Sequence, residues 1–261
     1  MYLEKEDYMN VRKISYSSLA AGALLLATVA PALAASTVVV TPTNQQGWST
    51  ADTRPGGAVN FVFDPTSPAP TGALQLTTDL TTAAKAQYLH AASTPLAQVQ
   101  ELSYYTKQNS ASFPQGDPSY QLPVMLNGAS GFTTLVFEPY QNVGNNGNTA
   151  VVPGAWQKWD VAAGLFWSSR TVTCVNGVVL GTPGGPATYT LAQLQSLCPS
   201  AQVVGFGVNI GSNNPGYDVQ TDLVNFNGTT YDFEQYMTPK SKDDCKNDGS
   251  TRTTWPRCRR C

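Results

Sequence analysis

Short apolar or alternating segments, each bounded by Gly, Pro or Asn, constrain the fold of this chain more than any other feature. They cover residues 58–63, 73–77, 101–107, 120–126, 132–138, 156–161, 203–210, 223–226 and 229–234. Segments of this length and pattern are typical of β-strands, and the Gly and Pro residues between them are typical of turns. The pattern predicts an all-β fold, an antiparallel sandwich with a single hydrophobic core.

A single segment after residue 35 has convincing helical periodicity. Leu191, Leu194 and Leu197 recur at three-residue intervals within residues 190–197, and Pro199 follows. A shorter helical turn is a further option at residues 82–88. We therefore expect one short helix beside the strands.

The first 34 residues have the pattern of a secretory signal peptide. Arg12 and Lys13 precede an apolar run at residues 19–30, and the small-residue triplet 32–34 follows. The run is shorter than the roughly 20 residues that span a membrane. We expect cleavage after residue 34 and a secreted, extracellular protein without a transmembrane segment. Three acidic residues before Met9 do not suit an export signal, so Met9 is an alternative start.

Three parts are expected after the leader. Residues 35–46 are predicted to be a linker, residues 47–238 the sandwich domain, and residues 239–261 a basic, flexible tail. Between residues 35 and 239 the chain has 11 acidic residues and five cations, which are Arg54, Lys85, Lys107, Lys158 and Arg170. So few cations do not form a basic surface along which nucleic-acid phosphates could bind. Nucleic acid is therefore not expected as a partner.

Five cysteines in an exported chain are disulfide candidates. Cys174 and Cys198 are the two within the predicted domain, and we expect them to form a bond that contributes roughly 3 kcal/mol. The remaining three are Cys245, Cys258 and Cys261 in the tail. Their pairing stays open. No zinc site is expected, because the chain has one histidine, His90.

Several motifs resemble a group of uncharacterised secreted bacterial proteins. They are Gly47-Trp48 and residues 72–76, 101–104, 156–160 and 222–234. Those proteins are similar to concanavalin A-like jelly-roll sandwiches, in which the opening and closing strands pair. The resemblance covers residues 47–234 and implies a jelly-roll fold much more than a function.

Residues 241–249 resemble a short Cys-containing tail found on many exported bacterial proteins. That tail usually continues with Trp and Phe, then Asn-Gln-Gly and a further Cys, whereas residues 250–261 depart from this pattern. Our hypothesis for this departure is a frameshift or a very divergent end. The pairing of Cys245 is therefore in doubt.

The predicted domain has no Glu-x-Asp and no Glu-x-x-x-Glu run, the arrangements of paired carboxylates that sandwich glucanases often use for glycoside hydrolysis. Glu138, which follows an apolar segment, is the one candidate acid or base; the alternative is a strand-end residue that faces water. His90 lacks a Ser or Cys nucleophile in motif context and is interpreted as a surface or packing residue. Tyr88 and His90 are too close together in the sequence to indicate the Tyr/His pair of a polysaccharide lyase.

Aromatic residues give the strongest functional indication. Trp159, Trp167, Tyr140 and Tyr217 are the candidate ligand-binding residues. Such rings stack on sugar faces while Asn, Gln and Asp bind the hydroxyl groups, although core packing is the commoner fate of a strand tryptophan. We expect no cofactor except for one possible structural calcium ion. Its candidate ligands are Asp218, Asp222 and Asp232.

Together these features predict a secreted, non-catalytic binding module for a neutral glycan or cell-surface polymer. The ligand is expected to be neutral because five cations are too few to hold a polyanion. One alternative is a glycan-active hydrolase or lyase on the same fold, with Glu138 and a distant Asp. The other alternative is a structural envelope or matrix protein that acts by protein contacts alone.

Overall fold

The computed structural model describes residues 35–69, 71–181 and 183–236. The predicted leader and the tail with its three cysteines lie outside the described residues. The described part contains sixteen strands, one α-helix and three short 3-10 helices. No helix within it is long and apolar enough to cross a membrane.

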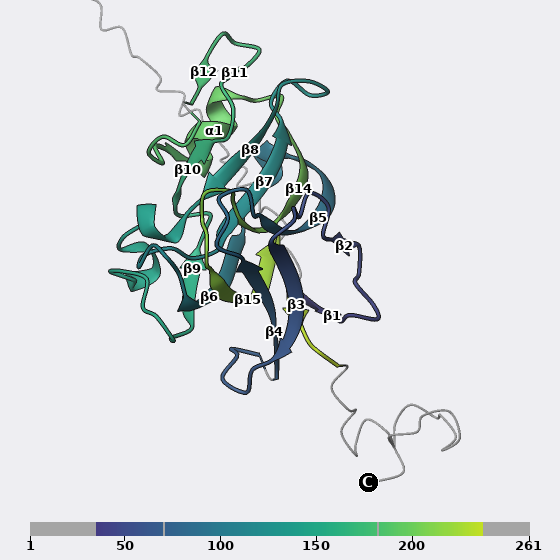
Figure 1. Cartoon of the computed structure of the whole chain (residues 1–261). Coiled ribbons are helices and arrows are strands. Elements are labelled where there is room, and N and C mark those ends of the chain that lie inside the picture. Colours follow the sequence, from purple (N-terminus) through teal and green to yellow (C-terminus); the bar gives the residue numbers. More distant parts are fainter. Residues whose placement is uncertain (1–34, 70, 182, 237–261) are drawn as a thin grey trace, which may run out of the picture. The chain divides into compact units, whose positions relative to one another are not determined.

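Two seven-stranded sheets form the two layers of the domain (Figure 1). The first contains β1 (Ser36–Val40), β16 (Thr229–Phe233), β15 (Asp218–Phe226), β4 (Gly72–Thr78) and β3 (Gly57–Phe63), with β6 (Leu102–Ser110) and β9 (Gln157–Asp160) on the other side of β15. The second runs β13 (Tyr189–Thr190), β10 (Leu165–Ser168), β8 (Phe132–Phe137), β7 (Ser119–Met125), β14 (Gln202–Ile210), β5 (Ala86–Pro95) and β2 (Trp48–Ser49). The predicted all-β jelly-roll sandwich with one short helix is confirmed.

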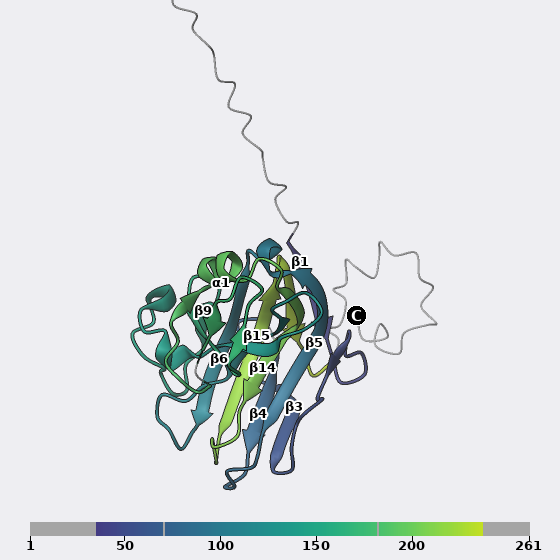
Figure 2. The same cartoon turned by 90° about the horizontal axis from the view of Figure 1, so that it is seen from above.

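The first and last strands pair with each other, as the resemblance implied. β1 lies parallel to β16, with Ser36 opposite Thr229 and Val40 opposite Phe233. Figure 2 shows the domain from above, with β1, β3, β4, β6, β9 and β15 of this sheet labelled. β1 falls within residues 35–46, which were expected to be a linker. The sandwich therefore includes these residues and begins before Gly47.

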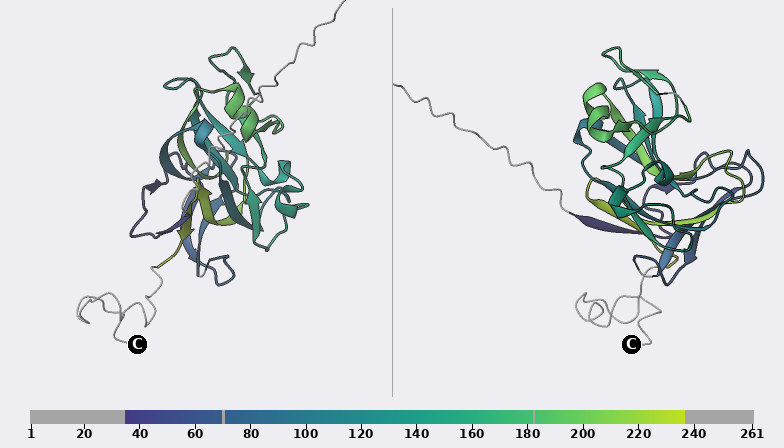
Figure 3. Two further views of the ribbon diagram at one scale, coloured as in Figure 1. Left: turned by 180° about the vertical axis from the view of Figure 1, so that it is seen from behind. Right: turned by 90° about the vertical axis from the view of Figure 1, so that its left-hand side faces the viewer.

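The hydrophobic core lies between the two layers, which Figure 3 shows from two further sides. Side chains of β7, in the middle of the second sheet, alternate between its two faces. Tyr120, Leu122 and Val124 are buried in the core. The alternating residues, Ser119 and Gln121 among them, point to the other face of the sheet.

The centre of the second sheet contains two residues that a regular strand would not favour. Pro123 lies in β7 beside a register shift in β14, and a shift of this kind tolerates a residue that donates no backbone hydrogen bond. At Gly207 a Cβ atom would lie 2.2 Å from the carbonyl oxygen of Tyr88, so only glycine allows this close approach. The face opposite the core is therefore nearly bare of side chains along part of β14.

Helix α1 (Leu191–Leu197) begins with a capping box between Thr190 and Gln193. Cys198, just after it, is bonded to Cys174 with a Cα–Cα distance of 5.4 Å, as predicted. The small hairpin of β11 (Val172–Thr173) and β12 (Val179–Leu180) lies at the same end of the sandwich (Figure 1). The 3-10 helices are η1 (Leu96–Gln98), η2 (Pro139–Gln141) and η3 (Asn145–Gly147).

The helical turn predicted at residues 82–88 is wrong. Strand β5 begins at Ala86, and Tyr88 is buried in the core. Pairing with β14 fixes this segment as extended chain, with Tyr88 opposite Val208. Cross-strand packing of β5 outweighs the helical preference of the Ala-rich sequence that precedes this strand.

Candidate functional site

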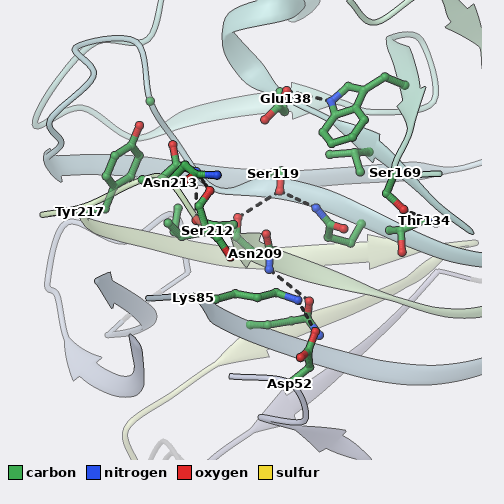
Figure 4. A pocket seen from close by; sticks show the side chains of 18 of the residues that line it. Asp52, Lys85, Ser119, Thr134, Glu138, Ser169, Asn209, Ser212, Asn213 and Tyr217 are labelled. Carbon is green, nitrogen blue, oxygen red and sulfur yellow. Dashed lines mark hydrogen bonds and ion pairs between the residues drawn. The ribbon is translucent and has the colours of Figure 1, made fainter. Parts of the chain in front are cut away.

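A groove of about 750 Å³ lies over the face of the second sheet that points away from the core. Its floor comes from five neighbouring strands, β5, β14, β7, β8 and β10, and the loops at residues 52–54, 113–117 and 211–217 contribute its walls. Figure 4 shows Ser119 and Asn209 in the floor, between Glu138 on one side and Asp52 on the other. We call this surface the groove.

A chain of hydrogen bonds crosses the floor of the groove. Gln121 Nε2 donates to Ser119 Oγ at 2.7 Å, and Ser119 Oγ donates to the carbonyl oxygen of Asn209 at 3.0 Å. Asn209 Nδ2 then donates to Gln87 Oε1 at 3.1 Å. The amide oxygens of Gln121 and Asn209 receive no hydrogen bond from the described residues. The floor therefore offers free acceptors, while several of its donors are used internally.

An indole and a carboxylate form one side of the groove. Trp167, on β10, is half-buried, and its Nε1 donates to Glu138 Oε2 at 2.8 Å. Gln141 Nε2 donates to the same oxygen at 2.7 Å. These bonds fix the indole beside the end of β8. The structure thus brings together two predicted site residues, Trp167 and Glu138.

Two more aromatic rings stand at the same end. Tyr140 is 39% exposed and Phe113 is 46% exposed. Their ring centroids lie 5.4 Å apart in an edge-to-face arrangement. Tyr140 was predicted as a site residue, whereas Phe113 was not, because it lies in a loop outside any predicted strand.

Tyr217 lines the groove but offers little surface to a ligand. Its side chain is only 3% exposed, and a Cβ atom on Gly116 would lie 2.0 Å from its hydroxyl. Burial, with smaller contributions from the charges of Glu138, Tyr140 and Asp117, raises the pKa of Tyr217 to about 12. Tyr217 is therefore an uncharged, buried residue in the wall of the groove, and the prediction that its ring face is available for stacking is wrong.

Asp117 is a groove residue that the sequence did not reveal. It is 9% exposed and accepts a hydrogen bond from Thr106 Oγ1 on Oδ2, while its Oδ1 is buried with no partner among the described residues. Burial raises the pKa of Asp117 to about 8, so the carboxyl group is mostly protonated at pH 7. Asp117 precedes β7 and lies outside every predicted strand, so no local pattern marks it as a site residue.

Charged residues form the opposite side of the groove. Lys85 Nζ pairs with Asp52, and Arg54 Nε lies 3.9 Å from the same carboxylate (Figure 4 labels Lys85 and Asp52). The hydrogen bond from Lys85 is the main cause that lowers the pKa of Asp52. Elsewhere on the rim, the Arg170 guanidinium lies 5.1 Å from the ring centroid of Phe132. Three of the five cations of the domain therefore line the groove.

The prediction that Trp159 stacks on a ligand is wrong. The side chain is 1% exposed and lies in the core, where its Nε1 donates to Thr106 Oγ1 at 2.8 Å. Trp159 lies opposite Tyr104 across β6 and β9, on the core face of the first sheet. Of the tryptophans proposed as sugar platforms, only Trp167 lies at the groove.

The three calcium candidates do not form one site. Asp218 Oδ1 accepts from Gln75 Nε2 at 2.8 Å, and Asp222 Oδ2 accepts from Ser67 Oγ at 2.7 Å. Burial, followed by the charge of a neighbouring glutamate, raises the pKa of Asp232 to about 6. In the part of the chain that the structure describes, no group of three or more His, Cys, Asp or Glu residues is placed to hold a metal ion.

His90 is a packing residue, as interpreted from the sequence. Its ring stacks on Phe206 with a centroid distance of 5.0 Å and contacts Trp48 edge-on. Both ring nitrogens lie within hydrogen-bond distance of main-chain carbonyl oxygens, those of Ala91 and Gln46. The imidazole is therefore held by its neighbours and does not line the groove.

No protein-family model matches this chain, and no curated protein matches it either. Among solved structures, it is similar to the family 11 carbohydrate-binding module from Clostridium thermocellum in complex with a beta-1,3-1,4-mixed-linked tetrasaccharide, at 10% identity and a TM-score of 0.39. That match covers 70% of this chain and 90% of the module.

A second similar structure is the N-terminal part of endo-1,4-beta-D-xylanase 10B from Clostridium thermocellum, with its CBM22-1 and GH10 modules and xylohexaose, at 11% identity and a TM-score of 0.32. The match covers 68% of this chain and 25% of that one. These alignments are too weak to bear on the residues of the groove.

Proposed function

We propose that this protein is a secreted binding module and that its groove binds a neutral glycan. One observation carries the proposal: the indole of Trp167 is held by Glu138 at one side of the groove, and the floor contains two amide oxygens, those of Gln121 and Asn209, that accept no hydrogen bond from the described residues. Sugars present apolar ring faces and hydroxyl donors together. An aromatic face next to free amide oxygens is complementary to both.

The width of the floor fits a chain of sugars rather than a single small molecule. Five neighbouring strands spaced about 4.8 Å apart give a floor of roughly 19 Å across. Such a floor has room for several linked rings. The nearly bare stretch of β14 at Gly205 and Gly207 leaves the middle of this path open.

The charges in the groove favour an uncharged ligand. Lys85 and Arg54 both contact Asp52, whose carboxylate compensates one of their two positive charges. Glu138 and Arg170 add one group of each sign, and Asp117 is mostly protonated at pH 7. A polyanion would therefore find little net attraction in the groove.

Secretion is supported by two independent features. The leader at residues 1–34 has the pattern of an export signal. Cys174 and Cys198 form a disulfide, and structural disulfides are typical of proteins that act in oxidising compartments outside the cytoplasm.

Binding can be tested by titration calorimetry with soluble β-glucan, xylan, galactomannan and amylose. We expect the protein to bind at least one of them and Trp167→Ala to lose most of that affinity. Tyr105→Ala is the matched control, since Tyr105 is an aromatic residue on the outer face of the first sheet, where it contacts Lys158. Absence of binding to all four polymers, or equal affinity of Trp167→Ala and the wild type, would overturn the proposal.

A further inference from the structure

One row of residues crosses the floor of the groove at the level of Trp167. Each member lies opposite the next on a neighbouring strand, in the order Leu89, Gly207, Gln121, Val136 and Trp167. Apart from the amide of Gln121 and the indole N–H, which both donate to groups outside the row, its side chains are apolar or absent. Under the proposed function, the apolar ring faces of a glycan main chain lie along this row.

The two sides of this row differ in polarity. On one side lies the hydrogen-bonded part of the floor around Asn209. On the other side, β7 and β8 pair Pro123 with Thr134, so a proline ring without a hydrogen-bonding group takes the place of an amide (Figure 4 labels Thr134 and Asn209). This second side continues along β8 to Phe132, which also lines the groove.

Phe132 and Arg170 lie together at the end of the less polar side, and we call them the rim pair. Phe132 is 37% exposed, and the guanidinium of Arg170 lies 5.1 Å from its ring centroid. The side chain of Arg170 is exposed and forms no ion pair and no hydrogen bond with the residues that the structure describes. The rim pair therefore offers an aromatic surface and N–H donors that no neighbour uses.

The separation of the rim pair from the row limits what can reach it. Phe132 lies four positions along β8 from Val136, which is roughly 13 Å of extended strand. A hydroxyl group or an acetyl ester on a sugar that rests on the row is too short to cover this separation. The group that contacts the rim pair is therefore a longer substituent at the edge of the main chain.

We propose that the rim pair binds an aromatic acyl group that is ester-linked to the glycan. This inference rests on the proposed glycan binding and adds a substituent to it. The aromatic ring of such a group packs against Phe132 and the guanidinium plane of Arg170. Its ester carbonyl oxygen accepts a hydrogen bond from the guanidinium, which has donors and no acceptor.

A substituent with a carboxylate would use only half of the rim pair. It would pair with the guanidinium of Arg170, but it has no apolar part to cover the exposed surface of Phe132. An aromatic ester uses the N–H donors and covers the ring. It also carries no charge, in agreement with the neutral ligand proposed for the groove.

Methyl ferulate probes the rim pair without a sugar main chain. We expect it to shift the NMR signals of Phe132, Thr134 and Arg170 in the full-length protein, and Phe132→Ala to remove the shifts at the other two residues. Absence of these shifts at millimolar probe would overturn the inference. Shifts in a protein that binds no polysaccharide would support the rim pair and overturn the glycan proposal.

Feruloylated arabinoxylan, compared with the same polymer after alkaline removal of its esters, tests the rim pair together with the groove. Titration calorimetry should give roughly 3- to 10-fold higher affinity for the esterified polymer. Phe132→Ala and Arg170→Gln should each remove most of this difference and leave the affinity for the ester-free polymer nearly unchanged. Tyr105→Ala and Lys158→Gln are the matched controls and should keep the difference, because they alter a second cation–aromatic pair, which lies on the outer face of the first sheet.

The outcomes separate this inference from the binding proposal. Equal affinity of the wild type for the two polymers would overturn the aromatic acyl subsite and leave glycan binding intact. A preference for glucuronic-acid-substituted xylan that Arg170→Gln loses and Phe132→Ala keeps would overturn it in favour of a carboxylate ligand. Thermal melts verify that each variant is folded.

Discussion

Trp167 Nε1 and Glu138 Oε2 lie 2.8 Å apart in a hydrogen bond that joins β10 to the end of β8. The bond crosses from one strand to its neighbour on the groove face, so the indole and the carboxylate keep a fixed relation to each other. A change at either residue should therefore affect the position of the other.

Trp167→Phe should weaken glycan binding less than Trp167→Ala, because the variant keeps an aromatic face but loses the bond to Glu138. For Trp167→Ala we expect a loss of about 1–3 kcal/mol of binding free energy, by analogy with aromatic stacking on nucleic-acid bases. Titration calorimetry gives the affinities and thermal melts the stabilities. Equal losses for both variants would mean that the bond, rather than the ring face, is what matters.

Trp159→Ala should destabilise the domain by about 3–5 kcal/mol, because it removes a fully buried ring and leaves a cavity. Urea unfolding followed by circular dichroism measures this change. Tyr105→Ala, which truncates a half-buried ring on the outer face of the same sheet, should cost much less. A Trp159→Ala variant with wild-type stability would contradict the core position of this tryptophan.

Replacing both Cys174 and Cys198 by serine should lower the free energy of unfolding by roughly 3 kcal/mol, since the bond closes a loop between residues 24 positions apart. The double variant avoids an unpaired thiol at either position. Urea unfolding of the double variant and the wild type gives the difference. Peptide mapping that finds these two cysteines unbonded in exported protein would refute the pairing.

Stability should fall as the pH rises from about 4 to about 8. Burial raises the pKa of Asp117 from 3.8 to about 8, so over this range the folded chain holds a proton that the unfolded chain has lost. The slope from one such group is at most about 1.4 kcal/mol per pH unit. The buried Asp222, with its pKa raised to about 7, acts in the same direction up to that pH.

Asp117→Asn checks this assignment, because it removes one titrating group and nearly preserves the shape. Urea unfolding at pH 5 and pH 8 should show a smaller loss of stability in the variant than in the wild type. Asp52 does not oppose this trend. Its pKa is lowered in the folded chain, so the stability that its ionised carboxylate contributes is present above about pH 4 and does not change further as the pH rises. Identical slopes for variant and wild type would show that Asp117 is not the group responsible.

Much of the fold could be predicted because most strands carry their own local pattern. The segment predicted at residues 73–77 is β4, Gly72–Thr78, and that at residues 203–210 is β14, Gln202–Ile210. Strand β5 was missed because Ala86–Pro95 contains few large apolar residues and several small or polar ones. Its conformation depends on pairing with β14, which no local window contains.

The candidate site could be predicted only in part, for the same physical reason. Trp159 and Trp167 look alike in sequence, and only their positions in the sheets decide that one is core and the other lines the groove. The edge-to-face contact of Phe113 with Tyr140 likewise joins segments that no local window contains. Aromatic composition indicated the kind of ligand, but strand pairing determines which residues meet.

The pairing of β1 with β16 also governs how the chain can fold. The contact between Ser36 and Thr229 joins residues 193 positions apart. That edge of the first sheet cannot be completed until nearly all of the described chain is available, and contacts between such distant residues form slowly. We therefore expect folding on a timescale of milliseconds to seconds, with β16 left as an open, aggregation-prone edge until β1 docks.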